Sequence, residues 1–139
     1  MNLLDVNVWL AGFWERHDAH QTVAAWRGSA NAPLALRRVT QMALLRHLTN
    51  RSVLGHDVRT RREAWATMTR LQSDAEVVWM NEPEHLEDAW RLLSARDDRD
   101  VKVSMDDYLA DFAQMAGATL VTLDGALARR YPDVDVLTL

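Results

Sequence analysis

The 139-residue chain contains no cysteine. Disulfide bonds and thiolate chemistry are therefore excluded, and cysteine usage leaves the redox compartment open. No apolar run approaches the roughly 20 residues that cross a bilayer. The first residues lack a basic segment and carry an acid at position 5, which is not the pattern of a secretory signal. We expect a cytoplasmic protein that does not contact a membrane.

Lysine is almost absent as well, because 15 of the 16 basic residues are arginine and only Lys102 is lysine. The net charge of −4 and the pI of about 5.7 argue against nucleic-acid binding through bulk charge. Arginine, however, is the side chain best suited to bidentate recognition of phosphate. The arginines cluster at residues 37–38, 59–62 and 129–130, whereas acids concentrate between residues 82 and 107. Solvated helix faces remain the simplest explanation for any single arginine.

Short apolar or β-branched runs alternate with stretches of helical periodicity. Strands are predicted at residues 2–4, 31–36, 76–80, 119–123 and 134–139. Helices are predicted at residues 6–14, 20–28, 40–50 and 104–117, and from residues 60 and 81 onward. This order is typical of a parallel sheet covered by helices on both faces. The length and mass, 15.9 kDa, fit a single domain over residues 1–139.

Local signals predict where these helices begin and end. Gly28 and Gly117 fit the residue after a helix C-terminus, and Thr40 and Asn81 fit N-caps, the latter with Pro83 in the first turn. Residues 60–63 form a capping box. A turn is predicted at residues 52–57 and a surface loop at residues 96–100. Trp9 and Trp14 are expected to be core residues.

Two aspartates each follow an apolar strand. Asp5 ends the first run, with Asn7 two residues later, and Asp124 ends the run at residues 119–123. Ligands bind at the carboxyl ends of strands in open α/β sheets. In a parallel sheet both side chains emerge at this same edge. An aspartate after a strand is also a common helix N-cap, which is the competing interpretation of Asp124.

Helix geometry separates three acids in the stretch 104–111. Leu109 and Phe112 belong to the apolar stripe of this helix, and Asp106 stands over the same face one turn earlier. Asp107 lies three residues after Ser104 and is predicted to complete a capping box. Asp111 is predicted to be solvated. Asp106 is therefore the candidate to meet Asp5 and Asp124, with complementation of the helix dipole as the alternative.

Three converging carboxylates either take up protons or bind a cation. With oxygen donors and no cysteine, a hard ion such as Mg²⁺ or Mn²⁺ is favoured over Zn²⁺. His17 and His20 are three residues apart, but a metal role for them is disfavoured. The sequence thus predicts a metal site made of Asp5, Asp106 and Asp124.

These residues carry a resemblance to a known family. The stretches 2–8, 39–50, 106–110 and 119–124 resemble, in order and spacing, the PIN-domain ribonucleases, and most of all the VapC toxins of bacterial VapBC toxin–antitoxin pairs. The resemblance covers essentially the whole chain. It implies a three-layer α/β/α PIN-like fold with a central parallel sheet of about five strands.

The resemblance also implies an activity and partners. It implies a metal-dependent endoribonuclease with Mg²⁺ or Mn²⁺ held by Asp5, Asp106 and Asp124, and with Asn7 at the family's second polar position. Toxins of this family usually form homodimers and are silenced by an antitoxin protein. They contact operator DNA only through the complex with that antitoxin.

One position departs from the family pattern. Where the family generally has Glu after the threonine of its second motif, this chain has Gln41, which keeps an oxygen but removes a negative charge. A weaker hold on a second cation is the expected consequence. Arg46 matches a family arginine and is expected to contact RNA or pair with the acids.

Two alternatives remain open at this stage. Asp5 could be the nucleophile of an aspartyl-phosphate phosphatase or the acceptor of a receiver domain. Such phosphatases require an acid at the position of Asn7. A receiver domain requires a lysine after a late strand, whereas the only lysine is Lys102. The neutral Gln41 also leaves room for a PIN-like domain that binds RNA or a partner without cleaving.

Overall fold

The computed structural model describes residues 1–139 and contains one five-stranded sheet in which every strand pair is parallel. The strands are β1 (Asn2–Leu4), β2 (Leu34–Leu36), β3 (Val77–Trp79), β4 (Thr119–Thr122) and β5 (Val136–Thr138), in the order β3-β2-β1-β4-β5. The predicted number and direction of strands are confirmed. Chain order reverses at β1, so the crevice beside its carboxyl end is a ligand position expected for open α/β sheets.

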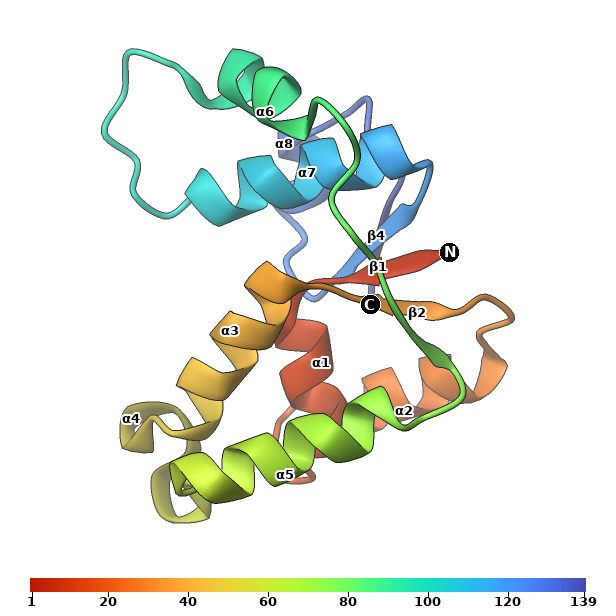
Figure 1. Cartoon of the computed structure of the whole chain (residues 1–139), viewed down its shortest axis with the longest axis vertical. Helices are drawn as coiled ribbons and strands as arrows, with labels where there is room; N and C mark the ends of the chain where they lie inside the picture. Colours follow the sequence, from red (N-terminus) through yellow and green to blue (C-terminus); the bar gives the residue numbers. More distant parts are fainter.

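Helices cover both faces of the sheet (Figure 1). The helices are α1 (Val6–Phe13), α2 (His20–Ser29), α3 (Arg38–Leu48), α4 (Arg51–Leu54), α5 (Arg61–Gln72), α6 (Leu86–Ser94), α7 (Ser104–Ala116) and α8 (Leu127–Arg130), with a 3₁₀ turn η1 at Gly55–Asp57. Helices α1 to α5 lie below the sheet in Figure 1, and α6 to α8 lie above it. All of the helices are too short or too polar to span a lipid bilayer.

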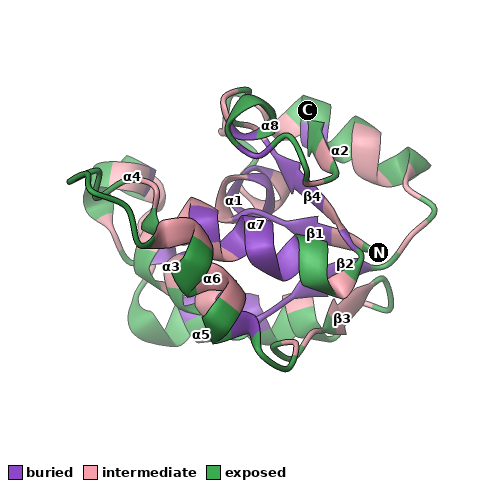
Figure 2. Cartoon of the chain, turned by 90° about the horizontal axis from the view of Figure 1, so that it is seen from above, coloured by how far each residue is buried: buried purple, intermediate pink, exposed green.

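Successive side chains along each strand point to opposite faces of the sheet, so the hydrophobic core has one part on each face. Leu3 and Leu120 pack with α6, α7 and α8, whereas Leu4 and Val121 pack with α1 to α5. The central strands are accordingly buried on both sides, as the purple ribbon of β1, β2 and β4 shows (Figure 2). Trp9 is 3 % exposed and lies in the lower core, as predicted.

Several predicted helix ends are confirmed by their capping geometry. Thr60 and Glu63 exchange the two hydrogen bonds of a capping box at the start of α5. Gly117 follows α7 with φ of 59°, a left-handed conformation that glycine adopts without a steric penalty. The predicted strand and helix that flank Asp5 also form, as β1 and α1.

Other predicted ends are wrong, and tertiary contacts explain them. Gly28 is inside α2, because Arg27 pairs with Asp74 and Glu76 before β3 and holds the last helical turn in place. Thr40 is not an N-cap: α3 begins at Arg38, directly after β2, and Thr40 is buried in its first turn.

The segment after β3 and the segment after α3 also differ from prediction. Asn81 does not cap a helix, since its side chain accepts a hydrogen bond from the indole of Trp79 (3.1 Å), and α6 starts only after His85. Residues 52–57 are not a simple turn. They form α4 and η1, because the Asn50 side chain caps α4 and Leu54 is buried.

Candidate active site

Asp5 and Asp124 follow neighbouring strands at the same edge of the sheet. β1 pairs with β4 with Leu4 opposite Val121, and the backbone N–H of Asp5 donates to the carbonyl of Val121 at 2.9 Å. The two aspartates therefore leave the sheet side by side, as their positions after parallel strands predict.

The carboxylate of Asp5 is buried and held at both oxygens. Its Oδ1 accepts from the backbone N–H of Val6 at 2.6 Å, which caps α1, and its Oδ2 accepts from the hydroxyl of Thr122 at 2.9 Å. Burial raises the pKa of Asp5, although both hydrogen bonds oppose that shift. The side chain is thus fixed before any ligand binds.

Thr122 connects three parts of the site. Its hydroxyl donates to Asp5, accepts from the Asn7 amide at 3.3 Å, and accepts from the backbone N–H of Asp124 at 3.1 Å. Thr122 is fully buried. Thr122 was not predicted as a site residue. A hydroxyl in an otherwise apolar strand is nevertheless a signal, because a buried hydroxyl needs hydrogen-bond partners.

Asn7 is tied to the end of β4. Besides donating to Thr122, its Oδ1 accepts from the backbone N–H of Leu123 at 3.2 Å. The structure therefore places Asn7 beside Asp5 but engages both ends of its amide. In this arrangement Asn7 holds the start of α1 against the end of β4. It thereby fixes the positions of Asp5 and Asp124 relative to each other.

Asp124 is exposed and forms a local turn. Its Oδ1 accepts from the backbone N–H of Ala126 at 2.8 Å, so the helix-cap interpretation holds in part for this residue. The second carboxylate oxygen is not used by this turn. Asp124 can thus keep its turn and still offer an oxygen at the sheet edge.

Asp106 lies at the N-terminal end of α7, within electrostatic reach of the other two acids. Burial raises its pKa to about 6, and the charges of Asp5 and Asp124 add to the increase. Arg130 opposes the shift through an ion pair of 3.0 Å. The role of Asp106 as a partner of Asp5 stays a prediction.

The three acids do not form a ready set of metal ligands. No group of three or more His, Cys, Asp or Glu side chains is close enough to hold an ion, and Asp106 pairs with Arg130 instead. The chemistry of the donors nevertheless fits a hard cation. Burial is the main cause of the raised pKa of Asp106, and the negative charges of Asp5 and Asp124 add to it. A divalent ion would offset these negative charges.

Asp107 and Asp111 do not have the predicted roles. Asp107 is buried and accepts from the hydroxyl of Tyr131 at 2.6 Å, while the N-cap of α7 is Val103 with no side-chain bond. Asp111 is also buried, and burial raises its pKa. Both predictions fail because α7 is covered on a second flank, where α6 and Tyr131 pack.

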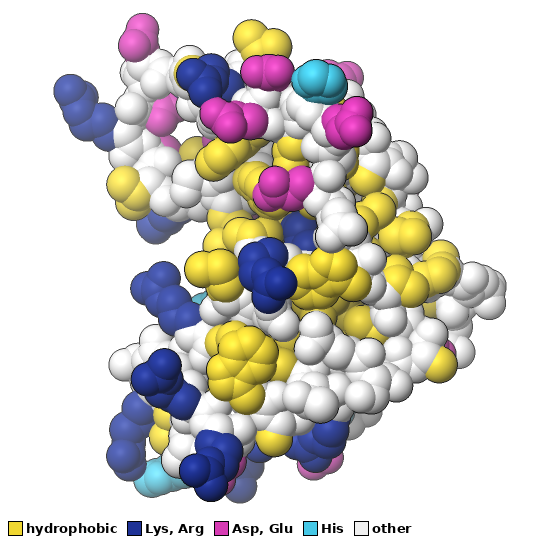
Figure 3. Space-filling view, viewed as in Figure 1, with side chains coloured by type: hydrophobic (Ala, Val, Ile, Leu, Met, Phe, Trp, Pro, Cys, Tyr) yellow, Lys and Arg dark blue, Asp and Glu magenta, His cyan; other side chains and the backbone are white.

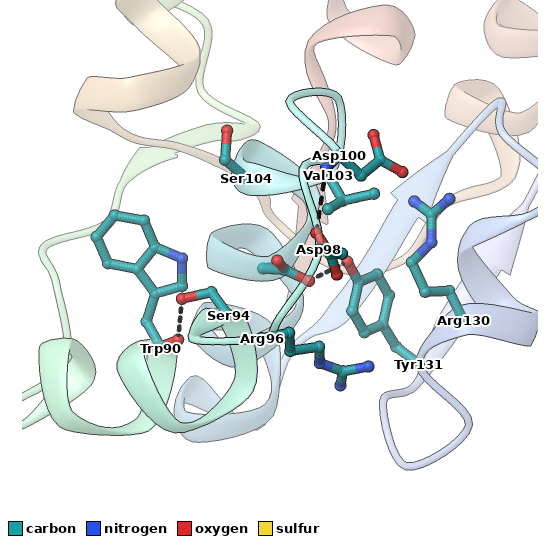
Figure 4. Close-up of a pocket in the computed structure, with 10 residues that line it drawn as sticks. Trp90, Ser94, Arg96, Asp98, Asp100, Val103, Ser104, Arg130 and Tyr131 are labelled. Atoms are coloured by element: carbon teal, nitrogen blue, oxygen red, sulfur yellow. Dashed lines mark hydrogen bonds between the residues drawn. The ribbon is translucent and has the colours of Figure 1, made fainter.

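A cavity of about 370 Å³ lies on this flank. Figure 4 shows Tyr131, Arg130 and Trp90 around it. Arg130 lines this cavity and also pairs with Asp106, so the cavity adjoins the acids without containing Asp5 or Asp124.

Gln41 and Arg46 both lie on α3. Gln41 is 3 % exposed and accepts a hydrogen bond from the guanidinium of Arg38 at 2.5 Å. Arg46 is exposed and lines a shallow pocket with Arg61 and Trp65 of α5. No ion pair joins Arg46 to the acids, so the expectation of such a pair is wrong. Contact of Arg46 with RNA stays a prediction.

Arg37 is a buried cation that the sequence analysis did not single out. It is 1 % exposed, and its guanidinium lies 4.3 Å from the ring centroid of Phe112 with no hydrogen-bond partner for its nitrogens. Burial lowers its pKa to about 10, and the negative charge of Asp5 opposes this shift. Arg37 in turn lowers the pKa of Asp5, so it offsets part of the repulsion among the acids.

The pKa of Asp106 predicts an unusual pH dependence of stability for the protein in EDTA. The carboxyl binds a proton near pH 6 in the folded state but only near 3.8 when unfolded. Folding is therefore penalised above pH 6, and the penalty is lost as the pH falls from 6 toward 4. We expect the difference in melting temperature between wild type and Asp106→Asn to shrink from pH 7.5 to pH 5. A difference that is constant with pH would contradict the raised pKa.

The chain belongs to the PIN domain family, whose profile matches residues 3–132. It is 42 % identical over 135 residues to Ribonuclease VapC41 of Mycobacterium tuberculosis, a match that covers 93 % of this chain and 92 % of that protein. The family assignment confirms the resemblance found in the sequence. It also shows that the aspartyl-phosphate alternatives are wrong.

Solved structures support the same fold. VapBC2 from Rickettsia felis, bound to a promoter DNA fragment, matches with a TM-score of 0.66 and 12 % identity over 99 % of this chain and 97 % of that chain. FitAcB from Neisseria gonorrhoeae matches with a TM-score of 0.65 and 20 % identity over 99 % and 97 %. The predicted three-layer α/β/α PIN-like fold is thereby confirmed.

Proposed function

We propose that this chain is a metal-dependent endoribonuclease and the toxin of a toxin–antitoxin pair. The ribonuclease activity rests on family membership and on the identity with Ribonuclease VapC41. The observation that supports the metal dependence is the placement of Asp5 and Asp124 side by side after β1 and β4, with Asp106 near enough for their charges to raise its pKa.

In this proposal Asp5, Asp106 and Asp124 would hold Mg²⁺ or Mn²⁺. A bound ion of this kind lowers the pKa of water and offsets negative charge on a phosphodiester. Thr122 and the Val6 N–H orient the carboxylate of Asp5 in advance. Arg130 balances the charge of Asp106, and its side chain is 39 % exposed, so it can move aside toward solvent or a phosphate.

The proposed partners follow from the similarity to toxins of VapBC pairs. We propose a cognate antitoxin protein, a homodimer, and contact with operator DNA only through the toxin–antitoxin complex. The support is the shared fold with VapBC2 of Rickettsia felis, whose structure contains a promoter DNA fragment.

The direct experiment uses purified protein free of antitoxin and stripped of metal with EDTA. We expect no cleavage of single-stranded RNA until Mg²⁺ or Mn²⁺ is added, and hydrolysis afterwards. Equal cleavage in EDTA would contradict the metal requirement. Binding of RNA with no cleavage under either ion would instead support the non-cleaving PIN-like domain that Gln41 suggests.

Gln41→Glu tests whether α3 contributes to the metal site. If Gln41 lines the site, the added charge should tighten Mn²⁺ binding about tenfold, equivalent to about 1.4 kcal/mol. Gln114→Glu adds the same charge at an exposed position of α7 and is the matched control. Calorimetric titration with Mn²⁺ measures the effect. An affinity equal to that of the control would place Gln41 outside the metal site, as a partner of Arg38 only.

A further inference from the structure

A second cavity opens at the same edge of the sheet as the acids. It has a volume of about 360 Å³ and lies where β2 and β3 end. The residues that line it include Arg37, Arg38, Trp79, Asn81, Glu82 and Tyr108. Since β3, β2 and β1 are consecutive strands, the cavity is about 10 Å from the end of β1, two strand spacings away. A chain that crosses Asp5 can reach it.

The wall of this cavity contains an exposed aromatic ring in a fixed orientation. Trp79 is 40 % exposed, and its indole N–H donates to Asn81 at 3.1 Å. The guanidinium of Arg38 lies 4.8 Å from the centroid of the Trp79 ring. Figure 3 shows a dark blue side chain beside large hydrophobic ones in the middle of this face. Aromatic rings and arginine planes are the surfaces on which unpaired bases stack.

Glu82 contributes a carboxylate to the lining of this cavity. Glu82 is exposed, and its Oε1 accepts from the hydroxyl of Tyr108 at 2.6 Å. Its second oxygen accepts no hydrogen bond from the protein. A carboxylate is an acceptor only, so it selects a base edge that offers donors. Guanine alone among the four RNA bases presents two neighbouring N–H donors on its Watson–Crick edge.

The charge of the lining also suits a nucleotide. Arg37 and Arg38 contribute two positive charges against the one negative charge of Glu82. The guanidinium of Arg37 has no hydrogen-bond partner in the protein, so its charge is not neutralised by a direct contact. The cavity thus combines a stacking surface, an acceptor for a base edge and a positive potential for the phosphate.

We propose that this cavity, the base pocket, binds an unpaired guanine of the RNA close to the scissile phosphate and thereby selects the cleavage site. The base stacks on the layer formed by Trp79 and Arg38, and the free oxygen of Glu82 accepts from its N–H groups. This inference rests on the proposed ribonuclease function and assigns the substrate feature that the enzyme reads.

The test measures RNA binding in EDTA, so that cleavage is not required. Fluorescence anisotropy compares short unstructured RNAs that differ by one base, guanine against uracil, adenine or cytosine. Trp79→Ala should weaken binding of the guanine RNA about 5- to 150-fold, the range for one stacked base. Glu82→Gln should remove the preference for guanine and leave the affinity for the uracil RNA unchanged.

Two matched controls share the chemistry of these changes but lie outside the base pocket. Trp26→Ala removes another indole, partly exposed on α2, and Glu84→Gln removes a carboxylate from the same segment as Glu82. Both controls should keep the affinity and the preference of the wild type. Melting temperatures of all four variants exclude loss of folding as the cause.

Cleavage mapping with Mg²⁺ or Mn²⁺ separates this proposal from the proposed function. We expect wild-type products to cluster next to guanines, and those of Glu82→Gln to lose that preference. If the wild type cleaves RNA with no base preference, or if both pocket variants behave like their controls, the base pocket is wrong and the ribonuclease stands. A preference for another base would overturn the guanine assignment. A wild type that cleaves no RNA would instead refute the proposed function.

Discussion

Asp106→Asn is expected to reduce RNA cleavage by about 10²- to 10³-fold, because it removes one charge from a site that acts by electrostatic stabilisation. Asparagine keeps the size of the side chain, and Asp106 has no structural partner except the partly exposed Arg130. The fold should therefore persist. Rates on one defined RNA at saturating Mn²⁺ measure the loss.

The neighbouring Asp107 supplies the control. Asp107→Asn retains an oxygen that can accept from the hydroxyl of Tyr131, so cleavage should stay near the wild-type rate. Asp5→Asn should behave like Asp106→Asn, since its amide oxygen can still cap α1. An inactive Asp107→Asn next to an active Asp106→Asn would reverse the assignment of these two acids.

The largest expected effect on stability is that of Phe112→Ala, about 3 to 5 kcal/mol of unfolding free energy. Phe112 is fully buried on α7, and its ring lies under the guanidinium of Arg37. Truncation leaves a cavity and also removes the ring that contacts a buried cation. Urea unfolding monitored by circular dichroism measures the change.

Phe13 is the only other phenylalanine and provides the comparison. It lies at the end of α1 and is partly exposed, so Phe13→Ala should cost clearly less than Phe112→Ala. Equal costs for the two variants would mean that the ring beside Arg37 has no special role.

The fold could be predicted from the sequence to a large extent, because strand and helix periodicity are local. Five short runs gave five parallel strands, and Asp5 and Asp124 stand where such strands end. Helix ends were less predictable. Gly28 and Asn81 carry the usual signals for helix ends, but the ion pairs of Arg27 and the hydrogen bond of Trp79 override them.

Candidate site residues could be selected from the sequence where their position depends on one helix face. Their contacts could not be predicted where these depend on how helices pack together. Asp106 was selected as a candidate because it stands one turn before the apolar stripe of α7, and its part in the site stays a prediction. Asp107 and Asp111 were misassigned, since a stripe defined by apolar residues does not show that a second flank of α7 is buried. Arg37 carried no sequence signal, because only the contact with Phe112 shows that this arginine is inside.

We propose that Asp5, Asp106 and Asp124 together hold a divalent ion. Crystals soaked in Mn²⁺, with diffraction recorded near the manganese absorption edge, test it directly. We predict an anomalous peak among these three carboxylates, with Asp106 released from Arg130. A manganese peak elsewhere, or none at a concentration that supports RNA cleavage, would contradict the claim.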